Sequence, residues 1–266
     1  MSRRDRNPDT LFAAALEGDR SALARLLSMI EQGGDDARTV GRLSYPLGGR
    51  SYTVGLTGAP GAGKSTLLSL GATALMPKSG KVSLNELDSR DQQTQFRKRV
   101  AWMPQQYRAV PGLTVRELVA YSGWLKGMSR DDSWRGASEA LARVALQDLA
   151  DRPASELSGG QQRRVGLASA LVHDAEVLLL DEPTSGLDPE QRALFRELLV
   201  KIGADRTVVV STHDTGEITT AYQHVALLHA GTIAFDGALQ DFSARAPAGS
   251  ERPIESAFLA LIAGGK

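Results

Sequence analysis

The sequence has no cysteine among its 266 residues and no long apolar run. Without cysteine, disulfide bonds and thiolate metal sites are excluded, and the composition suits a cytosolic protein. The longest apolar stretches, at about 177–180 and 258–262, fall far below the roughly 20 residues needed to cross a bilayer. The arginines near the start, Arg3, Arg4 and Arg6, have no apolar run behind them, so we expect no signal peptide. Any membrane role therefore requires a partner.

An excess of charge is also lacking, because 31 lysines and arginines balance 31 acidic residues. A polyanion partner would leave a basic excess or stripe, so no nucleic-acid partner is expected. The 42% hydrophobic and 23% charged residues are ordinary for a globular protein with a core. The length allows one large domain, or one domain with a small appendage.

The apolar pattern predicts an α/β fold with a mostly parallel sheet. Continuous apolar strands are expected at 176–180 and 207–211, as in parallel strands that are covered on both faces. Further strands are expected at 51–56, 81–84 and 100–103, with a hairpin at 225–228 and 232–235. Helices are expected at about 64–75, 115–126, 136–146, 163–173 and 190–202. Alternating strands and helices predict a layered fold.

Residues before this pattern predict a separate helical hairpin. Two short helices fit residues 8–31, with Asn7 and Asp19 as their caps. We therefore expect an N-terminal helical extension over 1–50, a nucleotide-binding domain over 51–245, and a tail over 246–266.

A glycine-rich motif follows the strand expected at 51–56. It fits G-x-x-x-x-G-K-[ST] between a strand and a helix, the context that a phosphate-binding loop requires. Its glycines let backbone N–H groups turn around phosphate oxygens, and the helix that follows points its positive end there. Lys64 can reach the β and γ phosphates, and the Ser65 hydroxyl can bind Mg²⁺. The motif consists of Gly58, Ala59, Pro60, Gly61, Ala62, Gly63, Lys64, Ser65 and Thr66.

Two acids, Asp181 and Glu182, follow the buried strand expected at 176–180. The carboxyl ends of strands in open α/β sheets are where ligands bind. Asp181 can hold Mg²⁺, and Glu182 can polarise an attacking water. A strand that ends in a solvated acidic turn is common, so these residues alone are a weak signal.

A serine-glycine turn lies just before the helix expected at 163–173. It consists of Ser158, Gly159, Gly160 and Gln161 after a leucine. A hydroxyl and two glycine N–H groups at a helix N-terminus form a second anion site, which a partner copy of the chain can use. Ser158 can also act as an ordinary helix cap, which does not account for the two glycines and the glutamine.

These motifs together resemble those of ABC transporter ATPases. Leu157–Gln161 resembles the ABC signature, and the run L-D-E-P-T-S-G-L-D-P at 180–189 resembles that family's acidic strand and the loop after it. Gln105 and His213 match the family's Q-loop glutamine and switch histidine. All four motifs follow the family's order.

The resemblance implies an ATP-hydrolysing subunit that works as a dimer with a separate permease, as in bacterial exporters. ATP would lie between the phosphate loop of one copy and Ser158–Gln161 of the other. Glu182 would activate water, His213 would contact the γ-phosphate, and Gln105 would touch Mg²⁺ or water. Asp188 would cross the dimer interface. A helical subdomain at about 106–160 would dock on the permease at the cytoplasmic face of the membrane.

Two tryptophans, Trp124 and Trp134, lie in this subdomain and are expected to be ordinary core residues.

The N-terminal part departs from this family. Residues 11–68 resemble the GTPase chaperones associated with methylmalonyl-CoA mutase, through L-E-G-D-R at 16–20, the leucines of 23–27 and the run 54–67. The guanine-reading N-K-x-D loop of such GTPases is missing, since neither Asn7 nor Asn85 precedes a lysine. We interpret the chain as a fusion with its joint in about 58–68.

The aromatic residue that stacks on adenine in ABC ATPases has no counterpart, because Tyr45 and Tyr52 lie too close to Lys64. Loss of such a stack is worth about 1–3 kcal/mol, or roughly 10–100-fold in ATP affinity.

Two alternatives stay open. One is a P-loop GTPase chaperone for a cobalamin-dependent mutase, which would prefer GTP to ATP. The other is a regulator without enzyme activity that binds nucleotide poorly.

Overall fold

The computed structural model describes residues 7–16, 18–32, 39, 52–218 and 221–263. The chain forms two compact units, residues 1–50 and 51–266, which are described separately. Tyr45 lies outside the described residues.

The first unit contains the predicted helical hairpin. Helix α1 spans Pro8–Leu16 and α2 spans Arg20–Gln32. The Asn7 carboxamide accepts a hydrogen bond from Asp9 N at 2.9 Å. The Asp19 carboxylate accepts from Ser21 N at 2.8 Å, so both predicted caps are in place. The two helices enclose a small core of Leu11, Ala22 and Leu26.

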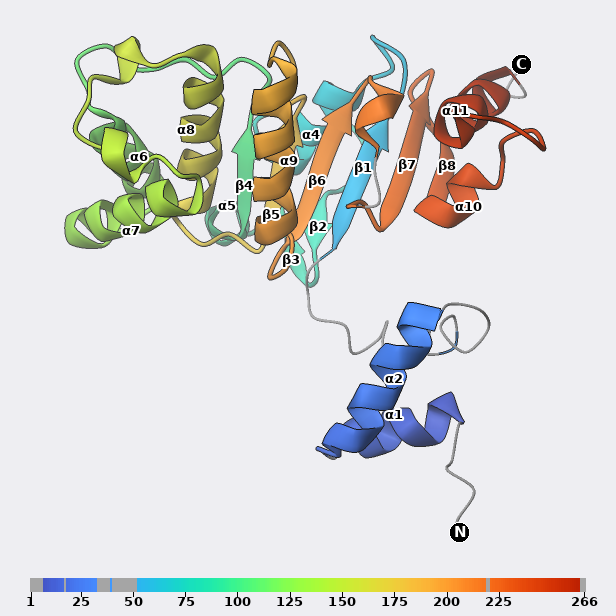
Figure 1. The fold of residues 1–266 in the computed structure, drawn as a ribbon. Helices are drawn as coiled ribbons and strands as arrows, with labels where there is room; N and C mark the ends of the chain where they lie inside the picture. The colour runs from blue at the N-terminus through green and yellow to red at the C-terminus, as the bar shows by residue number, and fades with distance from the viewer. Residues whose placement is uncertain (1–6, 17, 33–38, 40–51, 219–220, 264–266) are drawn as a thin grey trace. The chain divides into compact units, whose positions relative to one another are not determined.

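The second unit is built on a six-stranded sheet with the order β4-β5-β6-β1-β7-β8 (Figure 1). The strands are β1 (Thr53–Thr57), β4 (Val100–Met103), β5 (Val177–Asp181), β6 (Thr207–Thr212), β7 (His224–His229) and β8 (Thr232–Ala238). All neighbours pair in parallel except β7 and β8, which form the predicted antiparallel hairpin. The α/β fold with a mostly parallel sheet is therefore confirmed.

Helices cover both faces of this sheet. Helix α9 (Pro189–Ile202) lies on the face of the sheet that is toward the viewer in Figure 1, and α4 (Lys64–Gly71) lies on the opposite face. The strands carry the apolar residues that these layers need, since Leu178, Leu180, Val208 and Val210 are almost wholly buried. The layers hold the carboxyl ends of β1, β5 and β6 at one edge, where the site forms.

The stretch predicted as a helical subdomain, about 106–160, contains α6 (Val115–Leu125), α7 (Arg130–Arg143) and two short 3₁₀ turns (Gln147–Leu149 and Ala154–Glu156), and it ends at the start of α8 (Gly159–Leu171). Helix α7 begins earlier than the predicted 136, because the Ser129 hydroxyl accepts from Asp132 N at 3.1 Å and caps it there. The expectation that Trp124 and Trp134 are core residues is wrong, since they are 57% and 46% exposed.

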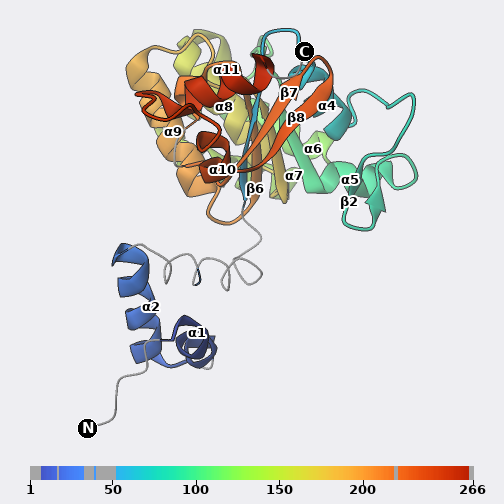
Figure 2. The same cartoon turned by 90° about the vertical axis from the view of Figure 1, so that its right-hand side faces the viewer.

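Several elements differ from the prediction or add to it. The helix expected at 64–75 ends at Gly71, and the strand expected at 81–84 is the short β2 (Ser83–Leu84), which pairs with β3 (Leu87–Asp88). Helix α5 (Gln93–Arg99) precedes β4, and a 3₁₀ turn (Thr215–Glu217) follows β6. Helix α10 (Leu239–Ser243) precedes the predicted tail, and α11 (Pro253–Ala263) lies within it; both helices pack at the β7–β8 end of the sheet (Figure 2).

None of the helices in the described part of the chain is long and apolar enough to span a membrane.

Candidate functional site

The phosphate loop connects β1 to α4, as its motif predicts. Residues 58–66 form this loop and the first turn of the helix. Gly58, Gly61 and Gly63 have φ values of 154°, 78° and 104°, in the region that favours glycine. A Cβ on Gly58 would also lie 2.2 Å from the Leu228 carbonyl oxygen at the end of β7. Glycine at 58 is therefore required by both backbone conformation and space.

Lys64 lies inside the curve of the loop. Its ammonium donates to the carbonyl oxygens of Gly58 at 2.7 Å and Ala59 at 3.2 Å. Burial lowers the pKa of Lys64, and the nearby carboxylates of Glu182 and Asp181 partly offset this effect. The Lys64 ammonium thus lies inside the loop, where the motif predicts that the phosphates bind.

Two of the three predicted magnesium ligands, Ser65 and Asp181, lie together, whereas the side chain of the third, Gln105, donates to Glu182. The Ser65 hydroxyl donates to Asp181 Oδ1 at 3.1 Å, and the Ser211 hydroxyl donates to the same oxygen at 2.6 Å. A hydroxyl and a carboxylate are oxygen ligands of the kind that Mg²⁺ takes together with water and substrate phosphates. The described residues contain no group of three His, Cys, Asp or Glu that could hold a metal without such help. The donor set therefore fits Mg²⁺ bound together with a nucleotide.

The Glu182 carboxylate contacts both Gln105 and His213, the two residues that the sequence predicts near it. Its Oε2 accepts from Gln105 Nε2 at 2.9 Å, and its Oε1 lies 2.8 Å from His213 Nδ1. The backbone of Glu182 has a φ of 45°, and its N–H donates to the Ser211 hydroxyl at 2.9 Å. The carboxylate is thereby aimed by a left-handed turn at the end of β5. Residues from two other chain segments, Gln105 and the pair Ser211 and His213, converge on Glu182.

Two further residues support this cluster, and the sequence reasoning missed them. Ser211 is fully buried and joins the backbone of Glu182 to the carboxylate of Asp181. The Arg163 guanidinium donates to the backbone oxygens of Gln105 and Ser185. The sequence places Ser211 at the end of a buried strand, which could have signalled its role; nothing local marks Arg163.

The serine-glycine turn begins α8. The Ser158 hydroxyl accepts from Gln161 N at 3.3 Å, and the Gln161 side chain accepts from Ser158 N at 2.9 Å. This reciprocal capping box accounts for the glutamine. A Cβ on Gly160 would lie 2.5 Å from Gln191 Oε1, whereas a Cβ on Gly159 would meet nothing within 4 Å. The Gln191 side chain is flexible and can move aside, so neither glycine is required by contact with a fixed backbone atom.

The serine-glycine turn is not bonded to the phosphate loop of the same chain. No hydrogen bond among the described residues joins residues 158–161 to the phosphate loop 58–66. Asp188, the residue assigned to the dimer interface, is exposed and caps α9 by accepting from Gln191 N at 2.8 Å. The structure thus brings Lys64, Ser65, Asp181, Glu182, Gln105 and His213 into one site, and leaves the signature turn and Asp188 outside that hydrogen-bonded group.

The Tyr52 side chain contacts His224 and not the phosphate loop. Its hydroxyl lies 2.5 Å from His224 Nδ1, and the two rings are 5.5 Å apart. It precedes β1, whereas the phosphate loop follows the other end of that strand. Tyr52 is therefore not positioned to stack on a base held at the loop.

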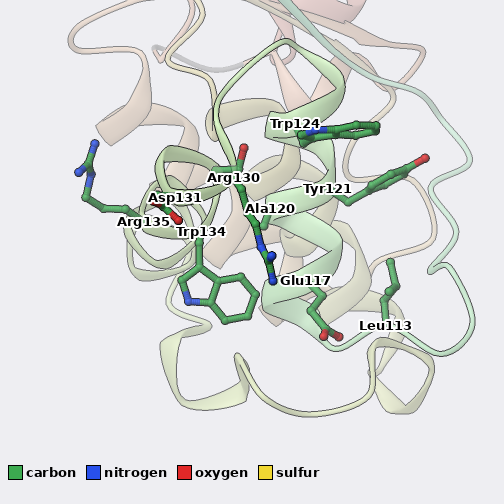
Figure 3. A pocket seen from close by; sticks show the side chains of 10 residues that line it. Leu113, Glu117, Ala120, Tyr121, Trp124, Arg130, Asp131, Trp134 and Arg135 are labelled. Carbon is green, nitrogen blue, oxygen red and sulfur yellow. The ribbon is translucent and has the colours of Figure 1, made fainter.

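A groove on the helical subdomain forms a second candidate surface (Figure 3). Its volume is about 730 Å³. Tyr121 and Trp124 stack with ring centroids 5.9 Å apart, and the Arg116 guanidinium lies 5.4 Å from the centre of the Trp134 ring. The lining residues are Leu113, Glu117, Ala120, Tyr121, Trp124, Arg130, Asp131, Ser133, Trp134 and Arg135.

Comparison with known proteins gives the same family from sequence and from structure. The ABC transporter family profile matches residues 49–185. The phosphonates import ATP-binding protein PhnC of Chromohalobacter salexigens is 35% identical over 219 residues, covering 77% of this chain and 79% of that protein. The methionine import ATP-binding protein MetN 2 of Pseudomonas entomophila is 38% identical over 190 residues, covering 69% of this chain and 57% of that protein.

Solved structures agree. The ATP-binding cassette MJ0796, in a dimeric post-hydrolysis state bound to ADP and Pi, matches with a TM-score of 0.63 and 30% identity over 71% of this chain and 85% of that one. The cbiO1 protein from Clostridium perfringens, part of the ABC transporter complex cbiONQ, has a TM-score of 0.65 and 28% identity over 73% and 80%.

The family match begins before the phosphate loop and runs through the acidic strand, so it includes the segment proposed as a fusion joint. The fusion with a mutase-associated GTPase stays a prediction. With the motifs, the fold and the relatives in agreement, the chain belongs to the ABC transporter family, as one of its ATP-binding subunits and ATPases.

Proposed function

We propose that two copies of this chain close around two ATP molecules and so drive a separate membrane permease from its cytoplasmic face. The observation that carries this proposal is the division of the site. One surface holds a hydrolytic group of Lys64, Glu182 and His213, and a separate surface presents the N-terminus of α8 at Ser158. A second copy is the natural donor of the missing anion contact.

Within one copy, each residue has a distinct role in hydrolysis. Lys64 and the loop N–H groups hold the β and γ phosphates, and Ser65 and Asp181 hold Mg²⁺. The metal, when bound, neutralises charge that develops on the phosphate oxygens. Glu182 accepts a proton from the attacking water, and Gln105 and His213 hold its two oxygens in place. Such a base contributes about 10²–10⁴-fold to the rate.

From the second copy, the α8 N-terminus would complete the pocket. The Ser158 hydroxyl and the N–H of Gly159 lie at the positive end of a 13-residue helix, which favours an anion. Asp188 is exposed at the start of α9 and would cross between the copies. That the related MJ0796 cassette was solved as a dimer supports this arrangement.

The groove around Tyr121 and Trp124 suits the permease. Monomeric proteins rarely expose neighbouring large aromatic side chains, and aromatic residues are enriched in the centres of protein interfaces. The groove contains Arg130 and Arg135 beside Glu117 and Asp131, so a short helix with apolar anchors and mixed charges would fit it.

This proposal does not include a direction of transport. The export expected from the sequence finds no support in PhnC and MetN, whose names describe import. The GTPase alternative is disfavoured by the family match and by the missing guanine-reading loop.

The test is the oligomeric state of Glu182→Gln. This variant keeps the ATP contacts and removes the base, so ATP and Mg²⁺ should convert it to a stable dimer in size-exclusion chromatography with light scattering. Lys64→Ala should lose nucleotide binding and stay monomeric. A Glu182→Gln protein that stays monomeric at saturating ATP and Mg²⁺ would overturn the dimer mechanism.

A further inference from the structure

A carboxylate outside the predicted motifs joins the two segments that carry Glu182 and His213. Glu217 has a side chain that is only 12% exposed. Its Oε1 accepts from the Thr184 hydroxyl at 2.6 Å, and its Oε2 accepts from the Thr212 hydroxyl at 2.8 Å. Thr184 lies two residues after Glu182, and Thr212 lies directly before His213. One side chain thus spans both loops.

The directions of these hydrogen bonds are consistent. The Thr212 hydroxyl accepts from Asp214 N at 3.0 Å, so its own proton goes to Glu217, its nearest acceptor. Thr184 and Thr212 are 4% and 2% exposed. Buried hydrogen bonds to a charged oxygen are about twice as strong as those between neutral groups.

Helix α9 supplies a cation to the same carboxylate. Arg192 Nε lies 3.8 Å from Glu217 Oε1, and another nitrogen of Arg192 lies 3.6 Å from Asp214 Oδ2. Arg192 also donates to the Leu187 carbonyl at 3.2 Å, beside the Asp188 cap. The bridge therefore reaches the loop that is proposed to cross the dimer interface.

The pairing of β5 with β6 fixes the starts of the two loops, where Asp181 lies opposite Ser211 and Glu182 N donates to the Ser211 carbonyl at 3.2 Å. A cavity of about 110 Å³ lies between them, and its lining includes Glu182, Thr184, His213 and Glu217. Beyond the paired strands, Glu217 joins the two loops beside this cavity through its hydrogen bonds to Thr184 and Thr212.

We propose that Glu217 is a positioning residue for ATP hydrolysis, which holds the loops of Glu182 and His213 in register through Thr184 and Thr212. The inference rests on the proposed roles of Glu182 and His213. Glu217 acts through these residues, since its carboxylate is bonded to the two hydroxyls behind them. Catalytic groups need a geometry held to about 0.5 Å, and a displacement of about 1 Å can lower a rate by about 10²-fold.

The test compares steady-state hydrolysis and nucleotide binding in the full-length protein. Glu217→Ala should lower kcat by about 10–100-fold, while ATP affinity and the number of nucleotides bound per chain stay as in the wild type. Glu217→Gln has one amide oxygen in place of two carboxylate oxygens and should be intermediate. Glu197→Gln, an exposed position on α9, makes the same charge change and should match the wild type.

A second measurement separates positioning from a purely structural role. In the Glu182→Gln background, Glu217→Ala should change the residual rate by less than about twofold, because residues that act as a unit are not additive. An equal loss in both backgrounds, or a loss of kcat that only follows a loss of binding-competent protein, overturns the inference.

The outcomes also separate the two proposals. If Glu182→Gln hydrolyses ATP at the wild-type rate, Glu182 is not the catalytic base, and the positioning role of Glu217 fails with it. An inactive Glu182→Gln together with a fully active Glu217→Ala overturns the positioning role alone.

Discussion

Replacing Gly58 by alanine tests how tightly the phosphate loop is packed against β7. The new Cβ would lie 2.2 Å from the Leu228 carbonyl oxygen, which belongs to the backbone of the sheet and cannot rotate away. The φ of 154° adds strain of about 1–3 kcal/mol. Overpacking against the backbone adds about 1–3 kcal/mol more. We therefore expect Gly58→Ala to lower the free energy of unfolding by about 2–6 kcal/mol.

Gly61→Ala is the matched control. Gly61 has a φ of 78°, so alanine is strained there too, but its Cβ would meet nothing within 4 Å. The difference between the two variants isolates the contact with Leu228 and should be about 2 kcal/mol.

Urea unfolding without nucleotide, followed by tryptophan fluorescence, measures this difference. All three tryptophans, Trp102, Trp124 and Trp134, lie in the unit of residues 51–266, so the signal reports on that unit. With a slope of about 2 kcal/mol per molar urea, Gly58→Ala should unfold about 1 M earlier than Gly61→Ala. Equal midpoints would refute the reasoning.

The remaining predictions concern the helical subdomain. Burial lowers the pKa of Lys126 to about 8, although its ammonium donates to the Arg97 and Val100 carbonyls. The unfolded chain therefore holds this proton to higher pH than the folded chain, and the free energy of unfolding should rise by about 1 kcal/mol between pH 8 and 9.5; the rise should be missing in Lys126→Met, and an equal rise in both proteins by urea titration would contradict the assignment. Thr114 forms a capping box with Glu117 at the start of α6, so Thr114→Ala should destabilise the protein by about 1 kcal/mol; an unchanged urea midpoint would count against the cap.

The sequence predicts the centre of the site because its signals are local. The phosphate loop depends on glycines that stand next to one another, and the acidic pair follows a strand that is apolar without interruption. Such a strand must lie inside the sheet, so Asp181 and Glu182 had to emerge at its edge. The order of the strands did not follow from any local pattern, since β1 pairs with β6 and β7, which lie far along the chain.

The residues that tie distant segments together could not be found in this way. Glu217 bonds to Thr184 across 33 positions, and although Thr184 lies in the run 180–189, nothing in the spacing points to Glu217 as its partner. Trp124 and Trp134 were misjudged because aromatic residues are usually buried, whereas here they line an open groove.

A local signal was overlooked in one case. The S-x-x-Q spacing of Ser158 and Gln161 predicts a capping box, and the structure contains it.

The hydrogen bonds of Lys64 to its own loop have a consequence for the speed of the catalytic cycle. Because the ammonium ties together the carbonyls of Gly58 and Ala59, the chain spends the entropy of shaping this loop when it folds. If the loop holds the triphosphate as we propose, the nucleotide meets a loop that is already shaped and takes over the hydrogen bonds of the Lys64 ammonium. Preorganisation of this kind leaves more of the interaction energy for holding the nucleotide. The same two hydrogen bonds would hold the loop in this shape again once product has left, ready for the next nucleotide.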